Sequence, residues 1–599
     1  MAVKRTFDWV QNPGSLKKLK KVVGIFQPGS TENVWLRNTR LPLLLRFSLI
    51  SGEDYNRFQT ELGKSAIEID YSMLKGRGSG SRKDALCTGI IQAVIDAQQN
   101  KSYTDDAGIT ETFKKPYTDD WSAEGYLRWA ISCGLIEYVK AADKCKITDL
   151  GKSLADSAAD SAGEKEALSQ ALLLYPPVIR VLSLLLEKDS QTKFDLGSRL
   201  GFKGELGFTS IPQAVYLCDY CEAETTKEKS AVKSNDEGDS DKYARGIASW
   251  CSQMGWVESS KKDVTDSYRG RTYTASLQTY SITRAGEKAL KKAKGNSSHP
   301  RLPRIVMFEM LASNKAHGAD YLRYQRAAII KAFSTTGKTL EQLQNTLKGY
   351  DLDMDTAAIK DHIDGLISIG IDISVKDDKY RLLDKIQNLE LPARSSCVKD
   401  HVNDIIDRVR SKLTHLDHKY LILISLAFSD AASRTKKNAD AREFEIQTAN
   451  LFTNELSFHG MRLGDSRRPD VIVSHHADGA IIDNKSYKDG FHISTSCRDE
   501  MSRYVNENII RSKTLNSNEW WTNFDSGVST YTFLFITSYL KGDFEKQLEY
   551  ISNANGGIKG AAISVENLLY FSEGMKSGKY HHKDFYNSFQ NKEMIFTTL

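Results

Sequence analysis

Two aspartates and a lysine in the last third of the chain have the types and spacing to hold a metal ion beside a phosphate. Asp470 directly precedes an apolar, β-branched run at 471–473, and Asp483 and Lys485 follow a second such run. Pro, Ser, His and Gly residues bound both runs, so the pattern predicts a pair of strands. Asp483 and Lys485 are two positions apart and therefore share one face of their strand. Carboxylates and an ammonium group converging there suit a hard divalent cation and a phosphate.

The same pattern also fits a surface hairpin with charged residues at its rim. Pro-Asp followed by Asp-x-Lys is a loose motif that often arises by chance. Carboxylates at the end of an apolar strand are, however, costly to bury without a partner or a metal ion. The rest of the chain has to decide between the two interpretations.

Length and composition narrow the class of protein. A chain of 599 residues predicts several domains, and 40% hydrophobic residues with 10% aromatics favour packed cores over disorder. No apolar run is long enough to span a bilayer, and residues 1–6 lack the apolar segment of a signal peptide. Eight cysteines are too few for a disulfide framework. We therefore expect an intracellular protein without a membrane partner. Its net charge of +5 permits nucleic-acid binding without requiring it.

Two segments far apart in the sequence share one layout. Each contains a helix that stops at a glycine, then a strand, a loop, a second strand and Ile-Thr-x-x-Gly at the start of another helix. The threonine can cap the free N–H groups of that helix. A helical unit followed by a two-stranded wing is the winged form of the helix-turn-helix, which reads the DNA major groove. The two segments are 125–154 and 243–289, and 359–383 is a weaker third copy.

Such units also occur as small helical domains that only pack on other proteins. Basic and amide residues near the helices favour DNA for the first two copies. The helix of the third copy is acidic at Asp361 and Asp364, so we expect it to pack against protein.

A different pattern begins after the proline-containing segment around Pro392. Helices and strands then alternate, which predicts a mixed α/β sheet with helices on its faces. The expected helices are 398–413, 418–424, one from 443 that runs to Gly460, 499–505 and 544–551, and the expected strands beside the central pair are 532–537 and 561–565.

At these residues the chain resembles the FokI group of type IIS restriction endonucleases. Each shared motif is short, but their common order extends nearly from end to end. The motifs are TFDWVQNPG at 6–14, LRWA at 127–130, SDKYAR at 240–245, SRRPD at 466–470, DNK at 483–485, DEMSRYV at 499–505 and NEWW at 518–521.

The resemblance implies three winged-helix recognition subdomains, mainly α, and a C-terminal α/β PD-(D/E)xK nuclease domain. It implies Mg²⁺-dependent cleavage of DNA outside an asymmetric site, in the cytoplasm of a bacterium, with a separate methyltransferase to protect the host. By resemblance, Asp470, Asp483 and Lys485 are the catalytic residues, and the two aspartates bind the metal with Glu445. Asn484 replaces an expected threonine. The implied domains are 1–160, 161–297, 298–386, a linker at 387–397, and 398–599.

The resemblance also implies which side chains read the DNA. Arg and Lys suit guanine, Asn and Gln suit adenine, and Glu accepts from cytosine. Matches at Glu237, Lys242 and Arg245 predict the site 5′-GGATG. Ser234 and Asp236 stand where an asparagine and a tryptophan are expected. The specificity at the DNA base positions that those two residues contact is therefore in doubt. The implied readers are Gln11, Asn12, Arg82, Trp121, Asn235, Glu237, Lys242 and Arg245.

Asp499 and Arg503 are four residues apart, which suits an ion pair within one helix. The resemblance implies instead that Asp499 of one nuclease domain pairs with Arg503 of a second nuclease domain, and the reverse. This pairing gives a transient homodimer on DNA. Ser496 and Arg498 depart from the family pattern beside them. Two rival hypotheses remain: a strand-specific nicking relative, and a DNA-binding regulator without nuclease activity.

Overall fold

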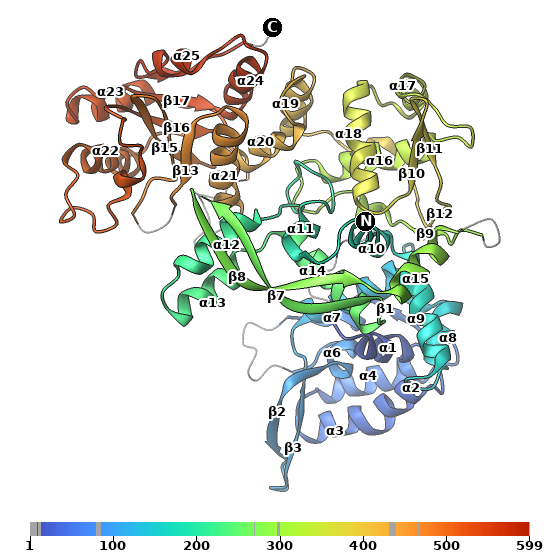
Figure 1. Cartoon of the computed structure of the whole chain (residues 1–599). Helices are drawn as coiled ribbons and strands as arrows, with labels where there is room; N and C mark the ends of the chain where they lie inside the picture. The colour runs from blue at the N-terminus through green and yellow to red at the C-terminus, as the bar shows by residue number, and fades with distance from the viewer. Residues whose placement is uncertain are drawn as a thin grey trace.

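Three mainly helical units and a mixed α/β domain follow one another along the chain (Figure 1). The structure is a computed structural model that describes residues 9, 14–78, 86–268, 270–295, 300–429, 439–464 and 467–597. Within these ranges no single helix is long and apolar enough to cross a bilayer. One bent pair, α9 (Ala162–Leu174) with α10 (Pro176–Glu187), meets that criterion by length and composition only.

The first unit contains the predicted helix, wing and capped helix. Helix α7 (Asp120–Ser132) ends before Gly134, β4 (Ile136–Val139) pairs antiparallel with β5 (Lys144–Ile147), and α8 (Asp149–Ala155) follows. The hydroxyl of Thr148 accepts a hydrogen bond from Gly151 N at 3.0 Å, so it caps α8. The other elements of the unit are α1 (Leu16–Gly24), α2 (Thr31–Trp35), α3 (Leu41–Arg46), α4 (Gly52–Leu62), β1 (Glu68–Asp70), α5 (Tyr71–Lys75), α6 (Ile90–Val94), β2 (Asp96–Thr104) and β3 (Thr110–Pro116).

The second unit repeats this layout with a longer wing. Helix α14 (Asp239–Gln253) begins four residues before the expected Tyr243, and β7 (Val257–Tyr268) and β8 (Arg271–Ile282) form the wing. Thr283 caps α15 (Arg284–Lys294) as Thr148 caps α8. Trp129 and Trp250 stack at 4.0 Å between ring centroids and join the two units in one core. The remaining elements are β6 (Gln191–Thr192), α11 (Lys193–Gly197), α12 (Gln213–Glu222) and α13 (Thr226–Asn235).

The third unit contains the weaker copy. Helix α18 (Thr356–Ser368) precedes the antiparallel hairpin of β10 (Ile373–Lys376) and β11 (Lys379–Leu382). The chain then forms β12 (Ile386–Gln387), which pairs parallel with β9 (Arg304–Ile305) before the last domain begins. The unit also contains α16 (Ala319–Ala332) and α17 (Leu340–Leu347).

A six-stranded mixed sheet organises the last domain. Its order is β13-β14-β15-β16-β17-β18, antiparallel from β13 to β15 and parallel from β15 onward. One apolar face packs under α20 and α24, and the other packs under α22 and α23 (Figure 1). The strands are β13 (His459–Arg462), β14 (Val471–His475), β15 (Asp478–Lys485), β16 (Thr530–Thr537), β17 (Gly560–Ser564) and β18 (Lys592–Glu593). The helices are α19 (His401–Arg410), α20 (Ile422–Ala427), α21 (Ala439–Asn450), α22 (Thr495–Ile510), α23 (Phe544–Ala554), α24 (Val565–Lys576) and α25 (His582–Asn587).

The predicted helix from 443 to Gly460 is wrong at its C-terminal end. Helix α21 continues into a π-helical turn, Leu451–Glu455, and β13 then occupies 459–462. Ser457 has a positive φ of 58°, which stops the helix, and Phe458 turns into the core beside Phe452. Apolar periodicity alone does not separate a helix from a strand that follows it after three residues.

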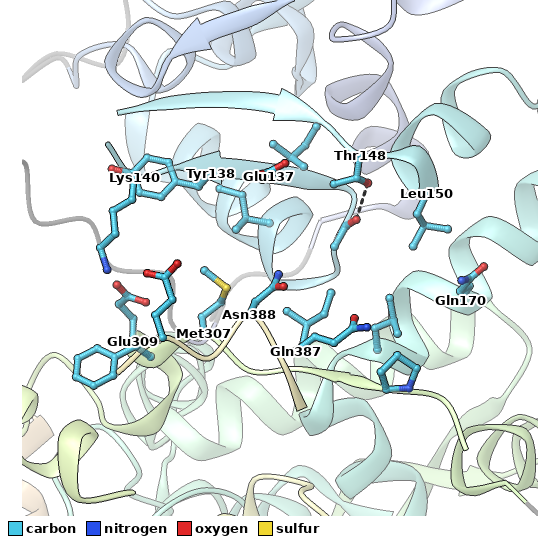
Figure 2. A pocket seen from close by; sticks show the side chains of 18 residues that line it. Glu137, Tyr138, Lys140, Thr148, Leu150, Gln170, Met307, Glu309, Gln387 and Asn388 are labelled. Atoms are coloured by element: carbon cyan, nitrogen blue, oxygen red, sulfur yellow. Dashed lines mark hydrogen bonds between the residues drawn. The ribbon is translucent and has the colours of Figure 1, made fainter. Parts of the chain in front are cut away.

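The cavity in Figure 2 lies away from this sheet, because none of its lining residues belongs to the last domain. It has a volume of about 530 Å³ and lies between the wing of the first unit and the β9–β12 segments of the third. Tyr138 and Lys140 face Glu309, Gln387 and Asn388 across it (Figure 2).

Gly460 is required where β13 approaches β14. A Cβ atom there would lie 2.3 Å from the backbone oxygen of Ile472. We expect Gly460→Ala to destabilise the last domain by about 1–3 kcal/mol, because the edge strand must move away from its neighbour. Differential scanning calorimetry of the full chain tests this. Gly527→Ala is the control, since a Cβ atom at 527 meets no atom within 4 Å, and equal melting profiles for the two variants would contradict the prediction.

Candidate functional site

Asp470 and Asp483 lie at the same end of neighbouring strands. Val471 is paired with Ile482 across β14 and β15, so Asp470 is opposite the Asp483 end of its neighbour. A carboxylate oxygen of Asp470 accepts a hydrogen bond from the backbone N of Asn484 at 2.7 Å. The antiparallel register therefore brings together two carboxylates that are thirteen positions apart in the sequence.

Asp483 and Lys485 share the sheet face under α22. The side chain of Asp483 is only 6% exposed, and Lys485 Nζ lies 2.8 Å from its Oδ2. This contact is an ion pair without hydrogen-bond geometry, because Asp483 Oδ2 is a buried oxygen that makes no hydrogen bond within the described ranges. Asn484 points to the opposite face, where its amide donates to Thr448 Oγ1 on α21 at 2.7 Å.

The electrostatics of this end of the sheet favour added positive charge. Burial raises the pKa of Asp470 well above its ordinary value, and the negative charges of Glu445 and Asp483 raise it further. Burial opposes the charged form of Lys485, but Asp483, Asp470 and Glu500 outweigh it and hold the pKa of that lysine well above its ordinary value. The lysine is therefore an ammonium at neutral pH.

The donor set fits a divalent cation held by few protein ligands. Asp483 has a buried oxygen without a hydrogen bond, and Asp470 is destabilised as an anion by its neighbours. Among the described residues, no group of three or more His, Cys, Asp or Glu side chains is arranged to hold a metal ion. Glu445 contacts Arg462 Nε at 2.8 Å. Mg²⁺ is commonly bound by one or two carboxylates, with waters and substrate phosphate completing its shell, and Asp470 and Asp483 are a donor set of that size.

The last domain matches the description "FokI, cleavage domain" over residues 399–596. The preceding units match "FokI, recognition domain, subdomain 1" over 5–157, "subdomain 2" over 164–298, and "FokI, D3 domain" over 311–378. The chain is 36% identical to the type II restriction enzyme FokI of Planomicrobium okeanokoites, with 99% of each chain covered. The chain belongs to the FokI family.

Other relatives agree with this assignment. The type II restriction enzyme StsI of Streptococcus sanguinis is 30% identical, over 95% of this chain and 92% of StsI. The solved structure of FokI superposes with a TM-score of 0.86, and that of FokI bound to DNA with 0.87. Both are 35% identical and cover 99% of this chain and all of the solved chain. The predicted fold class, three recognition subdomains and a C-terminal nuclease domain with a mixed sheet, is confirmed.

Only some of the base-reading residues that the FokI family implies lie within the described ranges. Gln11, Asn12 and Arg82 lie outside the described residues. Trp121 is in the first turn of α7 and is 51% exposed, with the guanidinium of Arg128 at 5.4 Å from its ring centroid. It is therefore a surface tryptophan rather than a core residue.

The second subdomain gathers most of its implied readers at the start of α14. Glu237 is buried between Lys193 and Arg245, at 2.8 Å from each, and Lys242 contacts Asp239 at 3.4 Å. Burial would raise the pKa of Glu237, but its two cationic neighbours lower it below its ordinary value. Asn235 ends α13 and is exposed.

Asp236, which replaces the tryptophan expected in FokI relatives, contacts the nuclease domain. Its side chain is fully buried and forms an ion pair with Arg442 of α21, at 2.5 Å between Oδ1 and Nη1. Arg442 also contacts Asp219 of α12 at 2.5 Å. The departure at 236 therefore joins the second subdomain to the nuclease domain.

The third subdomain meets the nuclease domain through its acidic helix. Asp361 of α18 lies 3.1 Å from Arg410 Nε and 2.7 Å from His418 Nδ1. The hydrogen bond to Asp361 raises the pKa of His418, despite its partial burial. The amide of Asn403 also donates to His317 O at 3.1 Å. Both the second and the third subdomain thus hold the nuclease domain in place.

The implied dimer residues do not form a pair within α22. The described contacts of Asp499, which is 61% exposed, include Arg498 at 3.0 Å but not Arg503. Arg503 instead lies 3.8 Å from both Glu500 and Glu507. The intrahelical ion pair is therefore not formed, and the carboxylate of Asp499 projects to solvent beside Arg498.

Sequence reasoning missed Glu500 and Tyr504 on α22. Glu500 lies 3.4 Å from Lys485 Nζ and accepts a hydrogen bond from the hydroxyl of Tyr504 at 3.1 Å. The signal was present, since both lie in the shared motif at 499–505. Only the packing of α22 across β15 brings them to the lysine.

Stability should fall as pH rises, because of a carboxylate buried at the boundary between α21 and α14. Burial, with the nearby charges of Asp241 and Asp440, raises the pKa of Glu443 from 4.5 to about 7. The proton is bound more tightly in the folded state, so this contribution is complete below pH 4.5 and is lost as pH rises through 7. A shift of this size corresponds to about 3 kcal/mol.

Glu443→Gln removes the titrating group and retains its shape. Between pH 5 and pH 8 we expect the melting temperature of the unmodified protein to fall more steeply than that of this variant. Glu549→Gln, at an exposed position on α23, should behave as the unmodified protein does. Parallel pH profiles for all three proteins would refute the assignment to Glu443.

Proposed function

We propose that this FokI-type restriction endonuclease is a type IIS enzyme that hydrolyses DNA phosphodiester bonds outside an asymmetric site, with Mg²⁺ as its cofactor. The observation that carries the proposal is the meeting of Asp470, Asp483 and Lys485 at one end of β14 and β15. This end lies in a domain that matches the FokI cleavage domain along nearly its full length.

The roles of the three side chains follow from their charges. Asp470 and Asp483 would hold Mg²⁺, with Glu445 beside them as a further candidate ligand. The bound ion would polarise the scissile phosphate and lower the pKa of the attacking water. Lys485 carries a positive charge beside these carboxylates. Its role is to orient that water and to offset the charge that develops on the phosphate.

We assign residues 1–160 and 161–297 to DNA reading, 298–386 to packing against the nuclease domain, 387–397 to the linker, and 398–599 to cleavage. Glu237, Lys242 and Arg245 support the site 5′-GGATG, because their types suit cytosine and guanine edges. Asn235 and Trp121, both exposed, are further candidate contacts, as are Gln11, Asn12 and Arg82. Asp236 is committed to Arg442, so the base that a tryptophan would serve has no equivalent contact from this position.

A direct test is cleavage of a plasmid that carries one 5′-GGATG site, with Mg²⁺ or with EDTA. We expect linear product only with Mg²⁺, and run-off sequencing should place both cuts at fixed distances from the site. Asp483→Asn should abolish cleavage and retain DNA binding in Ca²⁺, since it removes a metal ligand but no DNA-reading residue. Cleavage in EDTA, or an active Asp483→Asn variant, would refute the metal assignment. Cutting without dependence on the site would refute the proposed specificity.

Double-strand cleavage would require two nuclease domains, because one site of this kind cuts one strand. We propose a transient homodimer on DNA in which Asp499 of each copy meets Arg503 of the other. Arg498 competes for Asp499 within the chain, which favours weak pairing and keeps the nicking alternative open. A host that carries this enzyme would also need a separate methyltransferase.

Asp499→Ala should abolish linear product at low protein concentration and leave nicking, because it removes the carboxylate from the paired surface. Arg498→Ala should have the opposite effect and increase the ratio of linear to nicked plasmid, since Asp499 is then available to a partner. Supercoiled plasmid separates these products on a gel. If the unmodified protein yields only open circles at every concentration, it is a nicking relative, and the dimer proposal fails.

A further inference from the structure

The ammonium of Lys485 has two acidic neighbours with different geometry. Asp483 is nearer, at 2.8 Å, but that contact lacks hydrogen-bond geometry. Glu500 Oε2 accepts a hydrogen bond from Lys485 Nζ at 3.4 Å. The lysine therefore lies between a strand carboxylate and a helix carboxylate.

Glu500 is itself held by residues on its own helix. The hydroxyl of Tyr504 donates to the second carboxylate oxygen of Glu500 at 3.1 Å, and Arg503 Nη2 lies 3.8 Å from the same oxygen. Positions three and four residues apart lie on one side of a helix, so α22 positions all three side chains together. Tyr504 is only 4% exposed and packs against Trp520, which fixes the hydroxyl.

A lysine in such a position needs a fixed second acceptor. Its flexible four-carbon stem leaves the ammonium free to settle on the nearest carboxylate. That carboxylate is Asp483, whose oxygen the proposed Mg²⁺ needs. An ammonium that paired with Asp483 alone would compete more strongly with the metal for that oxygen.

We propose that Glu500, supported by Tyr504, is a positioning residue that gives the Lys485 ammonium a second acceptor beside Asp483 and so orients it toward the scissile phosphate. The proposal rests on the proposed function, in which Asp483 binds the metal and Lys485 acts on the phosphate. Glu500 is 39% exposed at its side chain, so water reaches it. Its effect on catalysis passes through the lysine.

The first test compares variants of the full-length protein in single-turnover cleavage. Glu500→Gln keeps the shape of the side chain and removes its charge. We expect the cleavage rate to fall about 10- to 100-fold, as is typical when a residue that orients an active-site group is replaced. The affinity for DNA in Ca²⁺ should not change. Tyr504→Phe should cause a smaller loss, and Glu500→Asp should recover part of the rate. Glu549→Gln is the control and should cleave normally.

The second test measures the affinity for metal and does not depend on cleavage activity. We expect Glu500→Gln to weaken Mn²⁺ binding about tenfold, measured by electron paramagnetic resonance on the protein alone, because the ammonium then pairs with Asp483 alone. In a Lys485→Met background the same substitution should have no effect. A loss of affinity in both backgrounds would make Glu500 a direct ligand and overturn the positioning role.

The outcomes also separate this proposal from the one on which it depends. If Lys485→Ala cleaves at the normal rate, the assigned role of the lysine fails, and the positioning role fails with it. If Lys485→Ala is inactive while Glu500→Gln cleaves and binds Mn²⁺ normally, only the positioning role fails. A weakened Tyr504→Phe variant with a normal Glu500→Gln variant would likewise contradict it.

Discussion

Repulsion among carboxylates at one end of a buried sheet is the constraint on which the nuclease domain depends. Asp470 and Asp483 are brought side by side by the antiparallel register of β14 and β15, and Glu445 adds a third negative charge nearby. Like charges in a poorly solvated place resist ionisation unless a cation joins them. Lys485 supplies one positive charge from the strand itself. The remaining negative charge favours a further cation at this end of the sheet.

Ionic contacts of the same kind join the domains. Arg442 binds two aspartates of the second subdomain, and Asp361 of the third binds Arg410 and His418 of the nuclease domain. Buried ion pairs add little net stability, because desolvation offsets their attraction, but a missing partner leaves a costly unpaired charge. They therefore favour one docked arrangement of the domains. Helix α21 takes part in both systems, since it carries Arg442 at the boundary and Glu445 beside the site.

The repeated units show which structural features a local sequence pattern predicts. Thr148 and Thr283 cap their helices as the Ile-Thr-x-x-Gly motif requires, and the wings follow at the expected glycines. Local sequence patterns failed where packing against another part of the chain determined the structure. Residues 459–462 became a strand because Phe458 and Gly460 fit the core and the edge of β14. Asp236 stands among base readers in the sequence, yet its side chain is buried against another domain.

The sequence by itself determined the family, the order of the four units, the central strand pair and the three residues at its end. Those features rest on contacts between near neighbours, on strand periodicity and on motif order, all of which a linear pattern records. Only the tertiary structure decided that Glu500 and Tyr504 reach Lys485, that Arg498 rather than Arg503 meets Asp499, and that α21 binds the second subdomain. These contacts depend on how separate helices pack across a sheet or a boundary, and residue spacing carries no record of that packing.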